Sequence, residues 1–144
     1  MDFWDTSAIV SLVLFQREAE ALAAVAEASG GRLALWWGTE VEAVSAVARL
    51  ARPGEVGADR AARALGQISE IVSRAQEVPP SEGLRAAALR AVRIHPLTAA
   101  DALQLAAALV WTDHSPSGVG FVCLDDRLRE AARREGFEVL PRAR

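Results

Sequence analysis

Residues Phe121 to Leu140 read FVCLDDRLREAARREGFEVL and contain three successive structural patterns. Phe121 to Leu124 is short and fully apolar, as expected of a strand that is buried on both faces of a parallel sheet. The residues from Asp126 to Arg134 predict a helix, and Phe137 to Leu140 predict a second strand. Because strands that alternate with helices build parallel sheets, this stretch predicts an α/β fold.

The same alternation extends over the rest of the chain, where turn residues such as Pro53-Gly54 and Pro79-Pro80 separate the apolar segments. Further strands are expected at residues 1–5 and 33–37. Helices are expected at residues 7–15, 17–28, 39–52, 58–76, 81–92 and 98–111. We therefore predict a single α/β domain over residues 1–144, in which helices cover a parallel sheet.

Composition excludes several classes of enzyme. All 16 basic residues are arginine, so nucleotide binding through a P-loop lysine, Schiff-base chemistry and serine–lysine hydrolysis are ruled out. Cys123 is the single cysteine, so the chain can form neither an internal disulfide nor a cysteine-based zinc site. We expect a cytoplasmic protein with no secretion signal and no membrane-spanning segment.

Four acidic residues occupy equivalent places relative to the predicted elements. Asp5 ends the first strand, and Asp125 lies where a later strand passes into a helix. Glu42 and Asp101 each lie in the first turn of a predicted helix. Strand carboxyl ends and the following helix starts line one edge of a parallel α/β sheet, where ligands bind. We therefore expect these carboxylates to converge.

Two interpretations of these acids remain open. Thr39-x-x-Glu42 has the spacing of a capping box, Thr98-x-x-Asp101 imitates one, and an acid at 125 or 126 could cap the next helix. Taken together, however, crowded carboxylates repel one another, and a hard divalent cation such as Mg²⁺ or Mn²⁺ would relieve that repulsion. Such ions activate water, so this second interpretation predicts metal-assisted hydrolysis of a phosphodiester.

Other polar and aromatic residues predict structural roles. His95 and His114 lack a second histidine at metal-binding spacing, so we expect them at the surface or at helix ends. Cys123 lies between apolar neighbours, which predicts a core thiol. The adjacent Trp36 and Trp37 are expected on opposite sides of the sheet, mainly for packing.

Four segments of this chain together resemble the PIN-domain ribonucleases of the VapC toxin type. They are Asp5-Thr6-Ser7 after a short strand, VEAVSAVAR from residue 41, DALQLAAAL from residue 101, and FVCLDDRL from residue 121. The resemblance runs from residue 2 to about residue 140. It implies a three-layer α/β/α domain with a short, mostly parallel sheet.

The resemblance also implies an activity and partners. Carried over position by position, Asp5, Glu42, Asp101 and Asp125 would bind Mg²⁺ or Mn²⁺ and cleave single-stranded RNA, with Asp5 and Asp101 holding the main ion. The family is often homodimeric, and an antitoxin protein covers its acidic crevice. The alternatives to the chosen acids are Glu40, which lies one strand period before Glu42, and Asp126, which directly follows Asp125. In two further positions the chain departs from the family, with Cys123 in place of a small hydroxyl residue and Gln104 where histidine is frequent.

Two other functions compete with this hypothesis. The first is a PIN-like interaction module whose acids only cap helices. The second is a phosphatase similar to the haloacid dehalogenases, which would require a second aspartate where this chain has Ser7. The net charge of −3 argues against a nucleic acid partner, but with the four acids set aside the arginines outnumber the remaining acids. Arg49 and Arg52 are the candidates for holding RNA.

Overall fold

The computed structural model describes residues 1–142 and contains one five-stranded sheet with the order β3-β2-β1-β4-β5. Its strands are β1 (Asp2–Trp4), β2 (Leu33–Trp36), β3 (Gln76–Val78), β4 (Gly120–Val122) and β5 (Glu138–Leu140). Every neighbouring pair of strands is parallel. The predicted α/β class is therefore confirmed.

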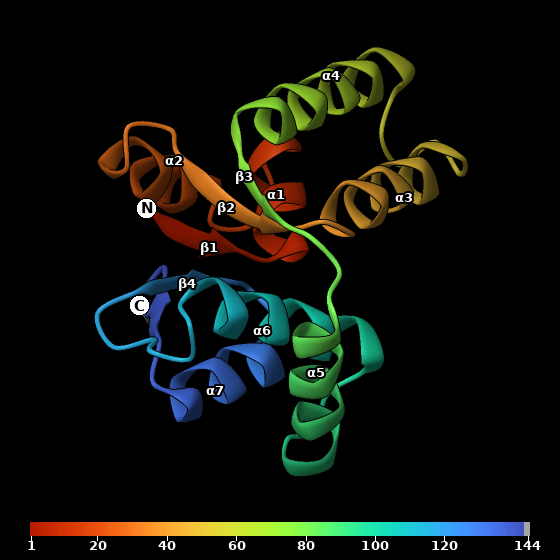
Figure 1. Cartoon of the computed structure of the whole chain (residues 1–144). Coiled ribbons are helices and arrows are strands. Elements are labelled where there is room, and N and C mark those ends of the chain that lie inside the picture. The colour runs from red at the N-terminus through yellow and green to blue at the C-terminus, as the bar shows by residue number, and fades with distance from the viewer. Residues whose placement is uncertain (143–144) are drawn as a thin grey trace.

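Helices cover both faces of this sheet (Figure 1). They are α1 (Thr6–Val13), α2 (Ala19–Ala28), α3 (Thr39–Ala51), α4 (Ala58–Arg74), α5 (Glu82–Ile94), α6 (Ala99–Trp111) and α7 (Asp126–Glu135). The first four helices lie on one side of the sheet, and α5, α6 and α7 lie on the other. The fold is thus the expected three-layer α/β/α arrangement. No helix within residues 1–142 is both long and apolar enough to cross a membrane.

Each face of the sheet has its own hydrophobic core, and β1 at the centre contributes to both. Phe3 and Trp4 are fully buried but point to opposite faces, as successive residues of a strand must. Phe3 stacks on Phe121 with ring centroids 5.5 Å apart, in the core under α5, α6 and α7. Because both faces of β1 are buried, the carboxyl end of this strand is held in place from two sides.

The strand β3 departs from the sequence prediction, which extended a helix to Gln76. Helix α4 ends at Arg74, and Gln76 and Val78 pair with Ala34 and Trp36 of β2. This strand lies at the edge of the sheet, and Gln76 is exposed. A three-residue edge strand has no continuous apolar pattern to distinguish it from a helix end, because its ladder of backbone hydrogen bonds is what makes it a strand.

Candidate functional site

The structure places all four predicted acids at the carboxyl edge of the sheet. Asp5 directly follows β1 and Asp125 follows the neighbouring β4, while Glu42 and Asp101 lie in the first turns of α3 and α6. Burial is the main cause of the raised pKa of Asp5, Glu42 and Asp101; in addition, the charge of Asp101 raises the pKa of Asp5 and Glu42, and the charge of Asp125 raises the pKa of Asp101. Asp101 therefore interacts electrostatically with each of the other three acids.

Asp5 is the most buried of these acids, with 3% of its surface exposed. One of its oxygens, Oδ2, accepts hydrogen bonds from the Ser7 hydroxyl (2.5 Å), the Ser7 backbone N–H (3.1 Å) and the Cys123 thiol (3.5 Å). Burial raises the pKa of Asp5 to about 6, even though the hydrogen bonds from Ser7 act in the opposite direction. This position therefore disfavours a negative charge unless a cation compensates for it.

Glu42 is held by an amide from the opposite layer. Gln104 Nε2 on α6 lies 2.9 Å from Glu42 Oε1, 2.8 Å from Thr6 Oγ1 and 3.0 Å from Thr39 Oγ1. Burial raises the pKa of Glu42, although the hydrogen bonds from Gln104 and Thr6 lower it. Gln104 is 1% exposed, and its Oε1 atom has no hydrogen-bond partner in the described residues. Sequence reasoning missed this role, for which the available signal was one amide within an otherwise apolar helix.

Helix capping accounts for part of this arrangement. The predicted capping box at Thr39 and Glu42 is wrong, because Gly38 is the N-cap residue and the Thr39 hydroxyl is buried against Gln104. At α6, Thr98 Oγ1 does accept from the N–H of Asp101 (3.2 Å), as predicted.

Two of the acids are themselves N-caps. Asp125 Oδ1 accepts from Leu128 N–H (2.9 Å) at α7, and Asp5 accepts from Ser7 N–H at α1. Each cap uses one side-chain oxygen, so capping and a shared acidic edge coexist in this structure.

The alternative acids, Glu40 and Asp126, take no part in the electrostatic coupling of the acidic edge. Glu40 is exposed, and its charge raises the pKa of Glu77 on β3, after the larger effect of burial on that residue. Asp126 is exposed in the first turn of α7. Neither Glu40 nor Asp126 contributes to the raised pKa values of Asp5, Glu42 and Asp101. Glu42 and Asp125 are thus the better placed member of each pair.

The site offers the carboxylate oxygens that bind Mg²⁺ or Mn²⁺, but these oxygens do not form a complete coordination shell. Its carboxylates supply the oxygen ligands that hard cations prefer, and burial, with a smaller contribution from neighbouring acids, raises the pKa of Asp5, Glu42 and Asp101. Within residues 1–142, however, no three Asp, Glu, His or Cys side chains are close enough together to hold one metal ion. The residues fit such an ion in donor type and charge.

Cys123 and the tryptophans have structural positions. Burial, together with the charge of Asp5, raises the pKa of the Cys123 thiol, so this group is a core thiol as predicted and not a nucleophile. Trp36 packs against the core under α5 and α6. Trp37 is 58% exposed and meets the Trp36 ring edge-on, with centroids 6.4 Å apart.

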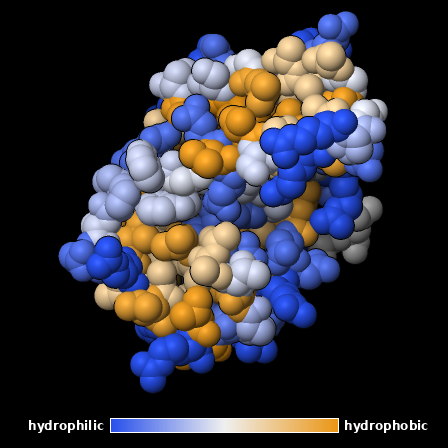
Figure 2. All heavy atoms as spheres, turned by 90° about the vertical axis from the view of Figure 1, so that its right-hand side faces the viewer, coloured by the Kyte–Doolittle hydropathy of each residue, from blue (hydrophilic) through white to orange (hydrophobic). Residues whose placement is uncertain are grey.

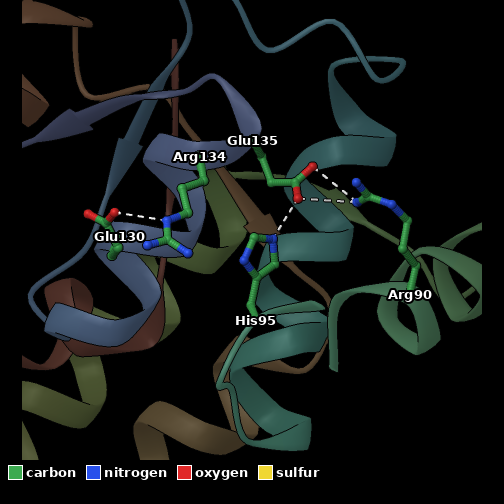
Figure 3. Close-up of polar contacts among 5 residues, drawn as sticks. All are labelled: Arg90, His95, Glu130, Arg134 and Glu135. Carbon is green, nitrogen blue, oxygen red and sulfur yellow. Dashed lines mark hydrogen bonds and ion pairs between the residues drawn. The ribbon is translucent and has the colours of Figure 1, made fainter. Parts of the chain in front are cut away.

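A second polar cluster lies away from the acidic edge and contains His95, which ends helix α5, one of the two places expected for it. This histidine is buried, and its Nε2 lies 2.6 Å from Glu135 Oε2 (Figure 3). Arg90 Nη1 approaches the same carboxylate at 3.1 Å. Burial alone would raise the pKa of Glu135, but hydrogen bonds from His95 and Arg90 outweigh it and hold that pKa below its usual value. His95 therefore joins the end of α5 to the end of α7, a long-range contact that sequence spacing does not reveal.

Replacing His95 with Asn is expected to lower the free energy of unfolding by roughly 1–3 kcal/mol, because Glu135 loses a buried partner. Chemical denaturation at neutral pH measures this loss. The matched control is Arg134→Gln, which removes the exposed pair with Glu130 drawn in Figure 3 and should change stability little. Equal midpoints for the two variants would contradict the structural role assigned to His95.

Comparisons with known proteins support the fold alone. No family profile matches this sequence, and no curated protein is similar to it. Among solved structures, the protein PAE2754 from Pyrobaculum aerophilum superposes with a TM-score of 0.61 at 22% sequence identity. The match covers 95% of this chain and 83% of the other. At this level of identity the likeness shows a common fold and carries no information about chemistry.

Proposed function

We propose that this protein is a metal-dependent endoribonuclease that hydrolyses phosphodiester bonds in single-stranded RNA. The observation that carries the proposal is the meeting of four acids at the carboxyl edge of the sheet, where the charge of Asp101 reaches Asp5 and Glu42 and the charge of Asp125 reaches Asp101. Carboxylates that destabilise one another at a sheet edge are stabilised by a divalent cation, and that edge is where α/β folds bind ligands.

Each residue has a defined part in this proposal. Asp5 and Asp101 would hold a Mg²⁺ or Mn²⁺ ion, while Glu42 and Asp125 would complete the site or orient the attacking water. When bound, such an ion supplies Lewis acidity and a water of lowered pKa. Ser7 fixes the Asp5 carboxylate, and Gln104 fixes that of Glu42, so the site needs little reorganisation on the buried side.

The biological role that we propose is that of the toxin in a toxin–antitoxin pair, acting in the cytoplasm. This rests on the resemblance of the sequence motifs, which implies an antitoxin partner and a homodimer. Exposed apolar side chains on α5 and around the start of α3 support a protein partner, with Trp37 at 58%, Val41 at 73% and Leu89 at 60% exposure. Figure 2 shows hydrophobic residues in the upper part and in the lower part of one face, with hydrophilic residues between them.

The direct test is cleavage of a labelled single-stranded RNA oligonucleotide with Mg²⁺, Mn²⁺ or EDTA. We expect internal cleavage with either ion and none in EDTA, and a DNA oligonucleotide of the same sequence serves as the control substrate. Cleavage that persists in EDTA, or that is absent with both ions over a range of RNA sequences, would contradict the proposal.

Metal binding should also be visible without catalysis. Saturating Mn²⁺ is expected to stabilise the wild-type protein, by about 2.7 kcal/mol at a hundredfold excess over the dissociation constant. Asp101→Asn should lose most of this gain, because it removes the carboxylate that is coupled to the other three. Thermal unfolding with and without Mn²⁺ measures the effect. An equal gain in the exposed-site variant Glu40→Gln is expected, and an equal gain in Asp101→Asn would place the metal elsewhere.

A second candidate is a PIN-like interaction module without catalytic activity. It is favoured by the N-cap bonds of Asp5 and Asp125, which give both acids a structural purpose. This candidate differs from the first in the sign of the stability change that is expected when Asp5 is neutralised.

A further inference from the structure

Three surface depressions follow one another along the acidic edge. The first, about 460 Å³, lies between α1 and α3 and is lined by Ser7, Glu42 and Arg49 among others. The second, about 450 Å³, is lined by Ser7, Arg17 and Asp125, so it joins the first at Ser7. The third, about 290 Å³, shares Arg17 with the second. The shared lining residues place the three depressions next to one another, and we call them together the edge groove; Asp5 and Asp101 line none of the three.

Arginines lie at both ends of the edge groove. Arg49 lines the end beside Glu42, whereas Arg52, the other arginine expected to hold RNA, lines none of the three depressions. The opposite end is lined by Arg17, Arg129 and Arg142. The groove also contains acids, which equal the arginines in number: Glu18, Glu42, Asp125 and Asp126. An anionic polymer can therefore pass the carboxylates while its charges are compensated on both sides.

Two of the arginines beyond Asp125, Arg17 and Arg129, are fixed to the segment that carries this acid. Arg17 Nη2 donates to the carbonyl of Leu124 (2.8 Å), and Arg129 Nη1 donates to that of Cys123 (2.8 Å). Arg129 also donates hydrogen bonds to the carbonyls of Leu140 and Pro141. Arg17, by contrast, is exposed and uses one N–H within the described part of the chain, so most of its five donors remain available.

We infer that the edge groove holds the sugar–phosphate backbone of single-stranded RNA, with Arg17 contacting a phosphate beyond Asp125 and Arg49 contacting one beyond Glu42. This inference rests on the proposed function and adds the path of the substrate. The guanidinium group suits the task, since its planar fork pairs with two phosphate oxygens at once. The three linked depressions suit a chain of several nucleotides better than one isolated phosphate.

The test measures RNA binding separately from cleavage. Fluorescence anisotropy of a labelled single-stranded RNA in EDTA, over a series of salt concentrations, gives the affinity and its salt dependence. We expect Arg17→Gln and Arg49→Gln each to weaken binding about tenfold and to reduce the slope of log affinity against log salt by about 0.7, the loss of one phosphate contact. Glutamine at position 17 retains a donor for the Leu124 carbonyl, and thermal unfolding of each variant checks the fold.

The matched control is Arg63→Gln, which removes an exposed arginine of α4 outside the edge groove and should leave affinity and slope unchanged. Arg17→Gln and Arg49→Gln variants that bind like Arg63→Gln, or a wild-type protein that binds no RNA, would overturn the inference. If the wild type cleaves RNA but these variants bind it normally, the inference fails and the proposed function stands. If the wild type binds RNA through both arginines but does not cleave it, the proposed function fails and the groove assignment stands.

Discussion

Asp101→Asn is expected to lower the rate of RNA cleavage at least about a hundredfold, the scale on which loss of one charged group at a reaction centre acts. Asp101 is the acid whose charge reaches Asp5 and Glu42 and which feels that of Asp125, so its loss affects the whole edge. Its backbone N–H still donates to Thr98, so α6 keeps its cap and the fold should persist. Single-turnover cleavage with Mg²⁺, together with circular dichroism of the variant, measures both properties.

The neighbouring acids provide the controls for this result. Glu40→Gln and Asp126→Asn remove exposed charges close in sequence to Glu42 and Asp125, and each should retain most of the activity. If Glu40→Gln lost as much activity as Asp101→Asn, Glu40 would replace Glu42 in the proposed site. If Asp126→Asn did so, Asp126 would replace Asp125. If Asp101→Asn cleaved RNA at the wild-type rate, the acidic edge would not be the active site.

Asp5→Asn is expected to stabilise the metal-free protein at pH 7 by an amount on the order of 2 kcal/mol. The pKa of Asp5 is about 6 in the folded protein and 3.8 in its unperturbed state. The folded state therefore binds the proton more tightly than the unfolded state, and the free energy of unfolding falls as pH rises from about 4 to about 6. Above that range the buried, ionised carboxylate lowers the free energy of unfolding, and asparagine has no such charge. The side-chain oxygen of asparagine can still cap α1.

Denaturation of the wild type and of Asp5→Asn between pH 4 and pH 8 in EDTA tests this expectation. The two stability curves should approach each other at the acidic end and separate as the pH rises. The exposed Asp126→Asn serves as the control and should follow the wild type throughout. A destabilised Asp5→Asn at pH 7 would instead favour the interaction module, in which the charge of this carboxylate stabilises the N-terminus of α1.

The α/β class could be predicted because parallel strands buried on both faces leave a clear record in the sequence. Phe121 to Leu124 and Leu33 to Trp37 are apolar throughout; β2 lies within the second of these segments, and β4 (Gly120–Val122) overlaps the first. The edge strand β3 has no such apolar pattern. Gln76 and Glu77 resemble the end of a helix, and only pairing with β2 makes them a strand. The prediction therefore worked for strands that are specified by burial and failed for the strand that is specified by its neighbour.

The positions of the acids along the chain were predictable for a similar reason. A carboxylate that follows a buried strand or begins the next helix lies at the carboxyl edge of an α/β sheet. Four separate segments could therefore be assigned to one edge. The partners of those acids were not predictable. Gln104 contacts Glu42 and Thr39 across the interior, and His95 contacts Glu135 between two helix ends, through tertiary packing that has no local signature.

The position of β1 between β2 and β4 has a consequence for how the protein is made. Asp5 is synthesised early, but β4 and Asp125 come from a distant part of the chain and must insert beside β1 to complete the edge. A ribosome-bound chain that has folded only α1 to α4 against β1 and β2 carries Asp5 and Glu42 without Asp101 or Asp125. If the acidic edge cleaves RNA, a nascent chain is inactive while the ribosome, itself built of RNA, is still translating it.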